Sequence, residues 1–147
     1  VGEVDKVSLD VKAAWEHYYD VTGLNCARHV QAALARYRDA HAASTLPEFE
    51  VVHTVIRGHE ADVPAVAAAA EGVDLVLQQG VWGREPPLSL AEFQALADQL
   101  HRPVRIRTKE IGEVLYQDGV FTVAGSMTVT DPKRLQPYYK SGVLDGD

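Results

Sequence analysis

A regular alternation of strand-like and helix-like segments in the middle of the chain constrains its fold more than any other feature. Three segments rich in β-branched or alternating apolar residues predict strands, at 49–57, 73–78 and 104–108. Between them, residues 62–71 predict a helix that stops at Gly72, and Ser89 with Glu92 forms a capping box that opens another helix. Strands that alternate with amphipathic helices favour a sheet with helices packed on it.

The flanking segments predict helices before this region and strands after it. Residues 1–10 read as a strand or a tail, Val11–Tyr19 as a short helix, and Cys26–Ala43 as a longer helix with Asn25 as its N-cap. The Asp-Gly pair at 118–119 predicts a hairpin over 113–123, followed by a strand at 126–130 and an irregular tail over 131–147. The 147 residues therefore predict one α+β domain, with N-terminal helices followed by a mixed sheet with packed helices.

Composition excludes several classes of protein. The hydrophobic fraction of 46% is sufficient for a core, and the net charge of −7 argues against a nucleic-acid partner. No apolar stretch approaches the roughly 18 residues of a membrane span, so no membrane partner is expected. The one basic cluster is expected to be a solvated strand face, and it consists of Arg102, Arg105, Arg107 and Lys109.

Cys26 is the only cysteine and the strongest candidate for chemistry. A single cysteine excludes a disulfide framework within the chain and a cysteine-rich zinc site. At the start of a helix, free amides and the helix dipole favour the nucleophilic thiolate, and the same amides can bind an oxyanion. The alternative is structural, because Cys26 shares an apolar stripe with Val30 and Ala33, and free cysteines are often buried as small hydrophobes.

A thiol hydrolase also needs a base, and two of the six histidines are the main candidates. His53 lies within an apolar strand, where it can face a helix N-terminus, and His59 follows a glycine at the end of that strand. Each can equally be a hydrogen-bonded structural histidine. The histidines show no metal-binding spacing, so no metal site is predicted.

Two segments resemble the ovarian-tumour (OTU) type of papain-like cysteine protease. Gly23-Leu24-Asn25-Cys26 and the helix after it resemble the D-G-N-C nucleophile loop, with only Asn25-Cys26 matching by identity. Trp82-Gly83, the helix through 90–100 and the strand at 102–106 resemble the W-G motif and the elements that follow it. The late histidine of the family has no counterpart here, since no histidine follows His101.

The resemblance implies a papain-like fold and a catalytic role for Cys26. Cys26 would be the nucleophile in hydrolysis of peptide or isopeptide bonds, including ubiquitin-type conjugates. Gly23, Leu24 and Asn25 would line the oxyanion hole, Trp82 would contribute to binding, and no cofactor would be needed. The substrate would be a protein, and an effector or toxin domain is one setting for such an activity.

Two other interpretations remain open at this point. One is a non-catalytic interaction domain on the same fold, with Trp82, Tyr138 and Tyr139 as anchors for a protein partner. The other is a small α/β module that carries a sulfur or nucleotide group, although no glycine-rich fingerprint supports it.

Overall fold

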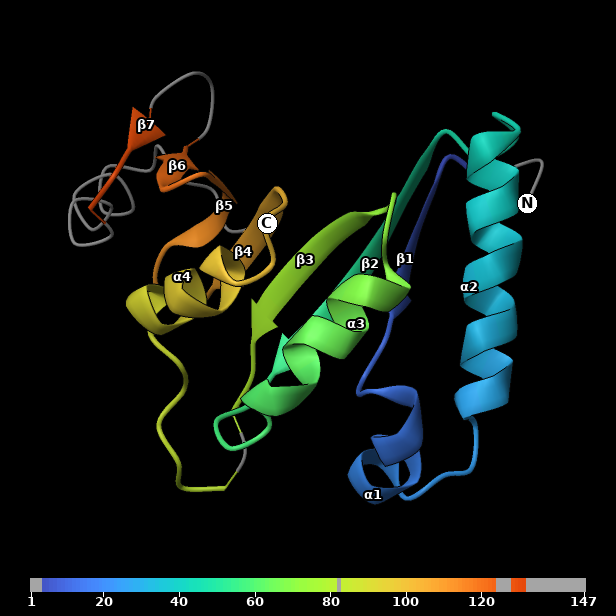
Figure 1. The fold of residues 1–147 in the computed structure, drawn as a ribbon, viewed down its shortest axis with the longest axis horizontal. Coiled ribbons are helices and arrows are strands. Elements are labelled where there is room, and N and C mark those ends of the chain that lie inside the picture. The colour runs from blue at the N-terminus through green and yellow to red at the C-terminus, as the bar shows by residue number, and fades with distance from the viewer. Residues whose placement is uncertain (1–3, 82, 124–127, 132–147) are drawn as a thin grey trace.

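Seven strands follow one another across a single sheet in the same order as in the chain (Figure 1). The computed structural model describes residues 4–81, 83–123 and 128–131. Neighbouring strands from β1 to β4 are parallel, and those from β4 to β7 are antiparallel. The strands are β1 (Lys6–Asp10), β2 (Glu48–Val55), β3 (Asp74–Gln79), β4 (Val104–Thr108), β5 (Gly112–Gln117), β6 (Val120–Thr122) and β7 (Thr128–Val129). The predicted α+β class with a mixed sheet is confirmed.

The helices connect the parallel strands. They are α1 (Tyr18–Thr22), α2 (Ala27–Ala42), α3 (Val63–Ala69) and α4 (Leu90–Asp98), and 3-10 turns at Trp15–His17 and Glu60–Asp62 precede α1 and α3. In Figure 1, α3 lies over β2 and β3 and α4 lies beside β4 and β5. None of the helices in the described ranges is long and apolar enough to cross a membrane.

Helices α2, α3 and α4 cover the same face of the sheet. From α2, Tyr37 packs on Phe49 of β2 with ring centroids 5.8 Å apart, and Arg38 donates to a carbonyl of α3. From α4, Gln94 donates to the Tyr116 hydroxyl of β5 over 3.2 Å. Since Phe49 and Tyr116 project from the same side of the sheet, that side is the helix-covered one.

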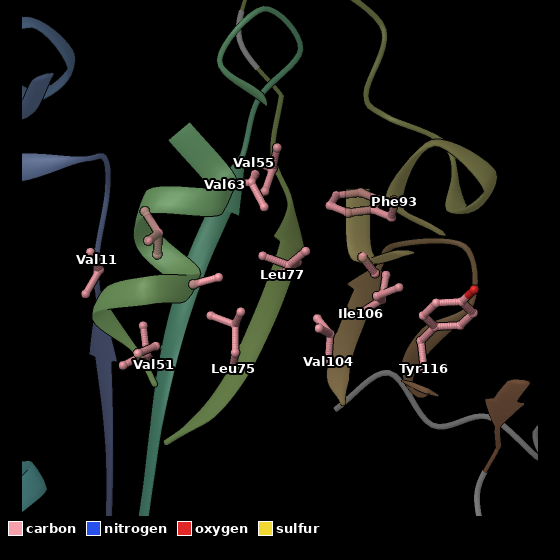
Figure 2. Close-up of a cluster of buried hydrophobic side chains, with 14 of the residues drawn as sticks. Val11, Val51, Val55, Val63, Leu75, Leu77, Phe93, Val104, Ile106 and Tyr116 are labelled. Atoms are coloured by element: carbon pink, nitrogen blue, oxygen red, sulfur yellow. The ribbon is translucent and has the colours of Figure 1, made fainter. Parts of the chain in front are cut away.

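The core lies between this face and the helices (Figure 2). The register places Val51 beside Leu75 and Leu77 beside Ile106, so apolar side chains form continuous rows across the parallel strands. All four are at most 1% exposed. Burial of these rows stabilises the association of strands and helices.

Local sequence signals form as predicted in two places. The Ser89 hydroxyl accepts from the Glu92 amide while the Glu92 carboxylate accepts from the Ser89 amide, which is the capping box at the start of α4. Asp118 and Gly119 both have positive φ, 50° and 82°, as a two-residue turn between β5 and β6 requires.

Two predictions of element boundaries need correction. The helix expected over Val11–Tyr19 starts only at Trp15, because the Val11 amide donates to the Val52 carbonyl and extends the β1–β2 pairing. The strand expected at 126–130 is observed at Thr128–Val129, while residues 126 and 127 lie outside the described ranges. The irregular tail predicted over 131–147 also lies outside them from residue 132 on.

The capping box gives a test of the local stability of α4. We expect Ser89→Ala to lower the free energy of unfolding by about 1 kcal/mol, because an amide of the first turn loses its acceptor. Urea unfolding followed by circular dichroism measures the loss. Ala91→Ser, at an exposed site on the same helix, is the control and should cost only about 0.5 kcal/mol through helix propensity. Equal losses in the two variants would contradict the capping role.

Candidate functional site

Cys26 lies at the amino end of α2, but the helix begins one residue later than the sequence predicted. Cys26 itself is the N-cap residue, with φ −118° and ψ 9°, and its carbonyl accepts from the amides of His29 and Val30. Asn25, predicted as the N-cap, is exposed and makes no capping hydrogen bond, because the helix starts one residue later than its side chain requires. The Cys26 side chain is partly buried and packs against the core.

The loop before Cys26 is held by its own hydrogen bonds. Gly23 ends α1 with φ 73°, and its amide donates to the Tyr19 carbonyl over 2.7 Å. The Leu24 amide donates to the Thr22 hydroxyl over 3.1 Å. The amides of Gly23 and Leu24 are therefore already engaged, and an oxyanion at Cys26 would depend on the free amides at the start of α2.

His53 is a buried imidazole with one unused nitrogen. The residue is 3% exposed, and its Nδ1 lies 2.8 Å from the Val11 carbonyl oxygen. Because a carbonyl only accepts, Nδ1 carries the hydrogen and Nε2 is left as an acceptor. Among the described residues Nε2 has no hydrogen-bond partner, and burial lowers the pKa of His53. The result is a neutral imidazole with a basic nitrogen.

One short segment connects His53 to the surroundings of Cys26. Val11 accepts from His53, and the amide of the next residue, Lys12, donates to the Tyr18 hydroxyl over 3.0 Å. The pKa of Lys12 is raised mainly by its hydrogen bond to Asp10, and the pKa of Tyr18 is raised mainly by burial. Cys26 packs against the same core cluster that contains Val11 and Tyr18. The Cys26 sulfur itself makes no hydrogen bond within the described part of the chain.

His17 and Asp62 form a pair that the sequence interpretation did not identify. His17 Nδ1 lies 2.8 Å from Asp62 Oδ1, and Asp62 Oδ2 accepts from the Ala14 amide over 3.0 Å. The hydrogen bond to Asp62 and its charge raise the pKa of His17. Burial opposes ionisation of Asp62, but the contacts with His17 and the Ala14 amide outweigh it and lower the pKa of Asp62. The two residues are 45 positions apart, so no local pattern in the sequence indicates the pair.

The other predicted site residues are exposed or lie outside the described residues. His59 is exposed, and its backbone starts the 3-10 turn before α3, with its amide donating to the Ile56 carbonyl. Trp82, expected to contribute to binding, lies outside the described residues. Leu24 is 64% exposed and Asn25 is also exposed.

The face of the sheet opposite the helices carries a network of charged side chains around Glu50. This carboxylate is 3% exposed; it accepts from Ser8 over 2.7 Å and from Arg105 over 3.1 Å, and Lys6 lies 3.4 Å away. Burial opposes ionisation of Glu50, but the hydroxyl and the cations outweigh it, so its pKa is lowered. Arg105 also bonds Asp74 over 2.6 Å.

The basic cluster predicted as a solvated strand face is therefore mostly paired. Besides Arg105, Arg107 donates to Gln78 over 2.8 Å and to Glu113 over 2.7 Å. Arg102 is on the other side of the sheet, where it donates to the carbonyls of Ala70 and Val73. Nothing in the spacing of the arginines shows these partners, because each acceptor comes from another strand or from the end of a helix.

No protein-family model matches the chain, and no curated protein matches it. Within the described ranges, no group of three or more His, Cys, Asp or Glu side chains is arranged to hold a metal ion.

The burial of His53 predicts a pH dependence of stability. Because its folded pKa lies below the ordinary value of about 6.5, only the unfolded chain binds a proton at first as the pH falls. The contribution of neutral His53 to the free energy of unfolding is complete above about pH 6.5. As the pH falls from there towards the lowered folded pKa, this contribution decreases by about 1.4 kcal/mol per pH unit at most. Urea unfolding at pH 7.5, 6.5 and 5.5 should show this loss.

Comparing the pH dependence of stability in the wild type and in His53→Gln separates the contribution of His53 from those of the other titrating groups. The variant should lose less stability than the wild type between pH 6.5 and 5.5. The His17–Asp62 pair does not account for such a loss, since the raised pKa of His17 keeps its contribution present below pH 6.5. Identical pH profiles for the variant and the wild type would contradict the assignment.

Proposed function

We propose that this protein is a cysteine-dependent hydrolase of peptide or isopeptide bonds, with Cys26 as nucleophile and His53 as base. The observation that carries the proposal is the buried Nε2 of His53, which has no partner in the described part of the chain. His53 also bonds the segment that contacts Tyr18, close to the start of α2 in the chain. A buried nitrogen without a partner is costly, and catalytic groups are one common reason for it. The sequence resemblance of Asn25-Cys26 to the OTU type of protease supports the same role.

The groups present supply each step of acyl transfer. His53 Nε2 takes the thiol proton, and the Cys26 sulfur attacks the substrate carbonyl carbon. The oxyanion is stabilised by the amides at the start of α2, and His53 returns the proton to the leaving amine, giving a thioester. Water then adds to the thioester with His53 as base, which releases the acid and the free thiol.

Two nearby carboxylates favour the imidazolium form of His53, which forms when His53 takes the thiol proton. The negative charges of Asp62 and Asp10 act to raise the pKa of His53 against the larger effect of burial. The imidazolium formed during proton transfer is therefore partly compensated. No hydrogen bond joins Cys26 to His53 in the described structure, so the proposal requires the two side chains to come together when substrate binds. Catalytic hydrogen bonds often tighten only at that stage.

The substrate we propose is a protein, with ubiquitin-type conjugates as the class that the resemblance implies. An effector or toxin domain would use the same chemistry on a protein of another cell.

Alkylation of the thiol tests the proposal without knowledge of the substrate. We expect iodoacetamide at pH 7 to label Cys26 in the folded protein faster than it labels glutathione. His53→Gln should lower the rate constant about tenfold or more, because general-base assistance is lost. His29→Gln, on the exposed side of the first turn of α2, is the matched control and should react like the wild type.

Two results would overturn the proposal. One is a Cys26 that reacts no faster than glutathione, or only in urea, and the other is an unchanged rate in folded His53→Gln. If that variant does not fold, the pH profile of the wild-type rate replaces it and should show a titration below pH 6.5. A set of ubiquitin-type conjugates, with Cys26→Ala as the inactive control, then tests cleavage directly.

The charged face of the sheet favours a second candidate function, a non-catalytic protein-interaction domain. Arg105, Asp74 and Arg107 present hydrogen-bonded charges on the face of the sheet opposite α2, α3 and α4. Such a surface suits a partner with complementary charges. For this function Cys26→Ala should leave binding intact, whereas Arg107→Ala should weaken it.

A further inference from the structure

The segment from Trp15 to Asn25, which leads into Cys26, makes few hydrogen bonds to the rest of the domain. From Trp15 to Asn25, most described hydrogen bonds stay within the segment or its immediate neighbours, such as those of Thr22 and Gly23. The contact that reaches a distant element is the hydrogen bond from His17 to Asp62, at the turn before α3. Asp62 also accepts from the amide of Ala14, directly before the segment, so one carboxylate binds both the segment and the residue that precedes it.

Tyr18 is the one fully buried residue of the segment, and the partly buried Trp15 and Val21 also pack against the core. Tyr18 is 2% exposed and stacks with Trp15 at a centroid distance of 5.7 Å. Tyr19 and Leu24, further along, are each 64% exposed. Figure 1 shows that α1 lies at the end of the sheet where α2 begins, so any movement of the segment displaces the chain that enters Cys26.

We propose that the hydrogen bond between His17 and Asp62 is a latch, which holds the Trp15–Asn25 segment against the turn before α3 and weakens as the pH rises. The latch positions Cys26 indirectly, by fixing the chain that precedes it. This consequence for Cys26 rests on the proposed function, whereas the latch itself does not.

The carboxylates around His17 all raise its pKa. Asp62 faces it from the turn before α3, and Glu16 and Asp20 face it from its own segment. All three favour the imidazolium, so the charged hydrogen bond persists up to the raised pKa of His17. Above that pKa the bond is between a neutral imidazole and a carboxylate, which is weaker than the charge-assisted form.

His53 faces the same carboxylate and is the one further titrating group beside it among the described residues. Since its pKa is lowered, His53 is neutral over the range in which His17 loses its proton. The two transitions are therefore separate on the pH axis. A change in the segment between neutral and alkaline pH that disappears in His17→Gln is therefore assigned to His17.

Amide hydrogen exchange measured by NMR on the full chain tests the latch. The useful probes are the amides of His17 and Gly23, since both donate hydrogen bonds within the segment. After correction for intrinsic exchange rates, we expect their protection to fall about threefold or more between pH 6 and pH 8.5. In His17→Gln and Asp62→Asn, protection should already be low at pH 6 and should not change further with pH.

His29→Gln, which removes an exposed histidine of α2, should retain the wild-type pH dependence. Protection that is independent of pH in the wild type, or unchanged in both latch variants, would overturn the proposal. The two proposals can fail separately. If hydrogen exchange contradicts the latch, the alkylation of Cys26 can still depend on His53; if alkylation contradicts the hydrolase, the exchange result still stands.

Discussion

The parallel register of β1 to β4 is the constraint on which the rest of the structure depends. It aligns Val51 with Leu75 and Leu77 with Ile106, which makes one face of the sheet apolar and brings the helices onto that face. It also sends the carboxyl ends of the strands to the same end of the sheet. The connections that leave β1 and β2 therefore meet there, and they bring Cys26, His17 and Asp62 into one region.

The pKa values of two histidines in this region, His53 and His17, are shifted in opposite directions by their environments. Burial keeps His53 neutral, and a neighbouring carboxylate keeps His17 charged over a wider range. A neutral base and an imidazolium can therefore coexist near neutral pH within one short stretch of structure. Separated pKa values of this kind are typical of sites that both accept and hold protons.

Features determined by adjacent residues were predictable from the sequence. The capping box at Ser89, the positive-φ turn at Asp118 and the bounds of β4 all follow from chemistry within a few positions. The start of α2 was displaced by one residue, because Asn25 has the right side chain but the helix geometry begins at Cys26.

The candidate site was predictable only in part, because its contacts join distant positions. Cys26 and His53 could be selected from their places at a helix start and in a strand. The tautomer of His53 depends on a carbonyl 42 residues away, and the pairing of Arg105 with Glu50 spans 55 residues. Such contacts exist only after the strands align, so their residue types show no periodic pattern beforehand.

The end of α3 illustrates how far this short helix depends on its neighbours. Seven residues are too few for a helix to persist alone in water, and four of these are alanines. Its terminal carbonyls are bound by Arg38 from α2 and by Arg102 from the connection between α4 and β4. During folding, α3 should thus become ordered only once both neighbours have docked, which makes it a late reporter of assembly rather than a nucleus.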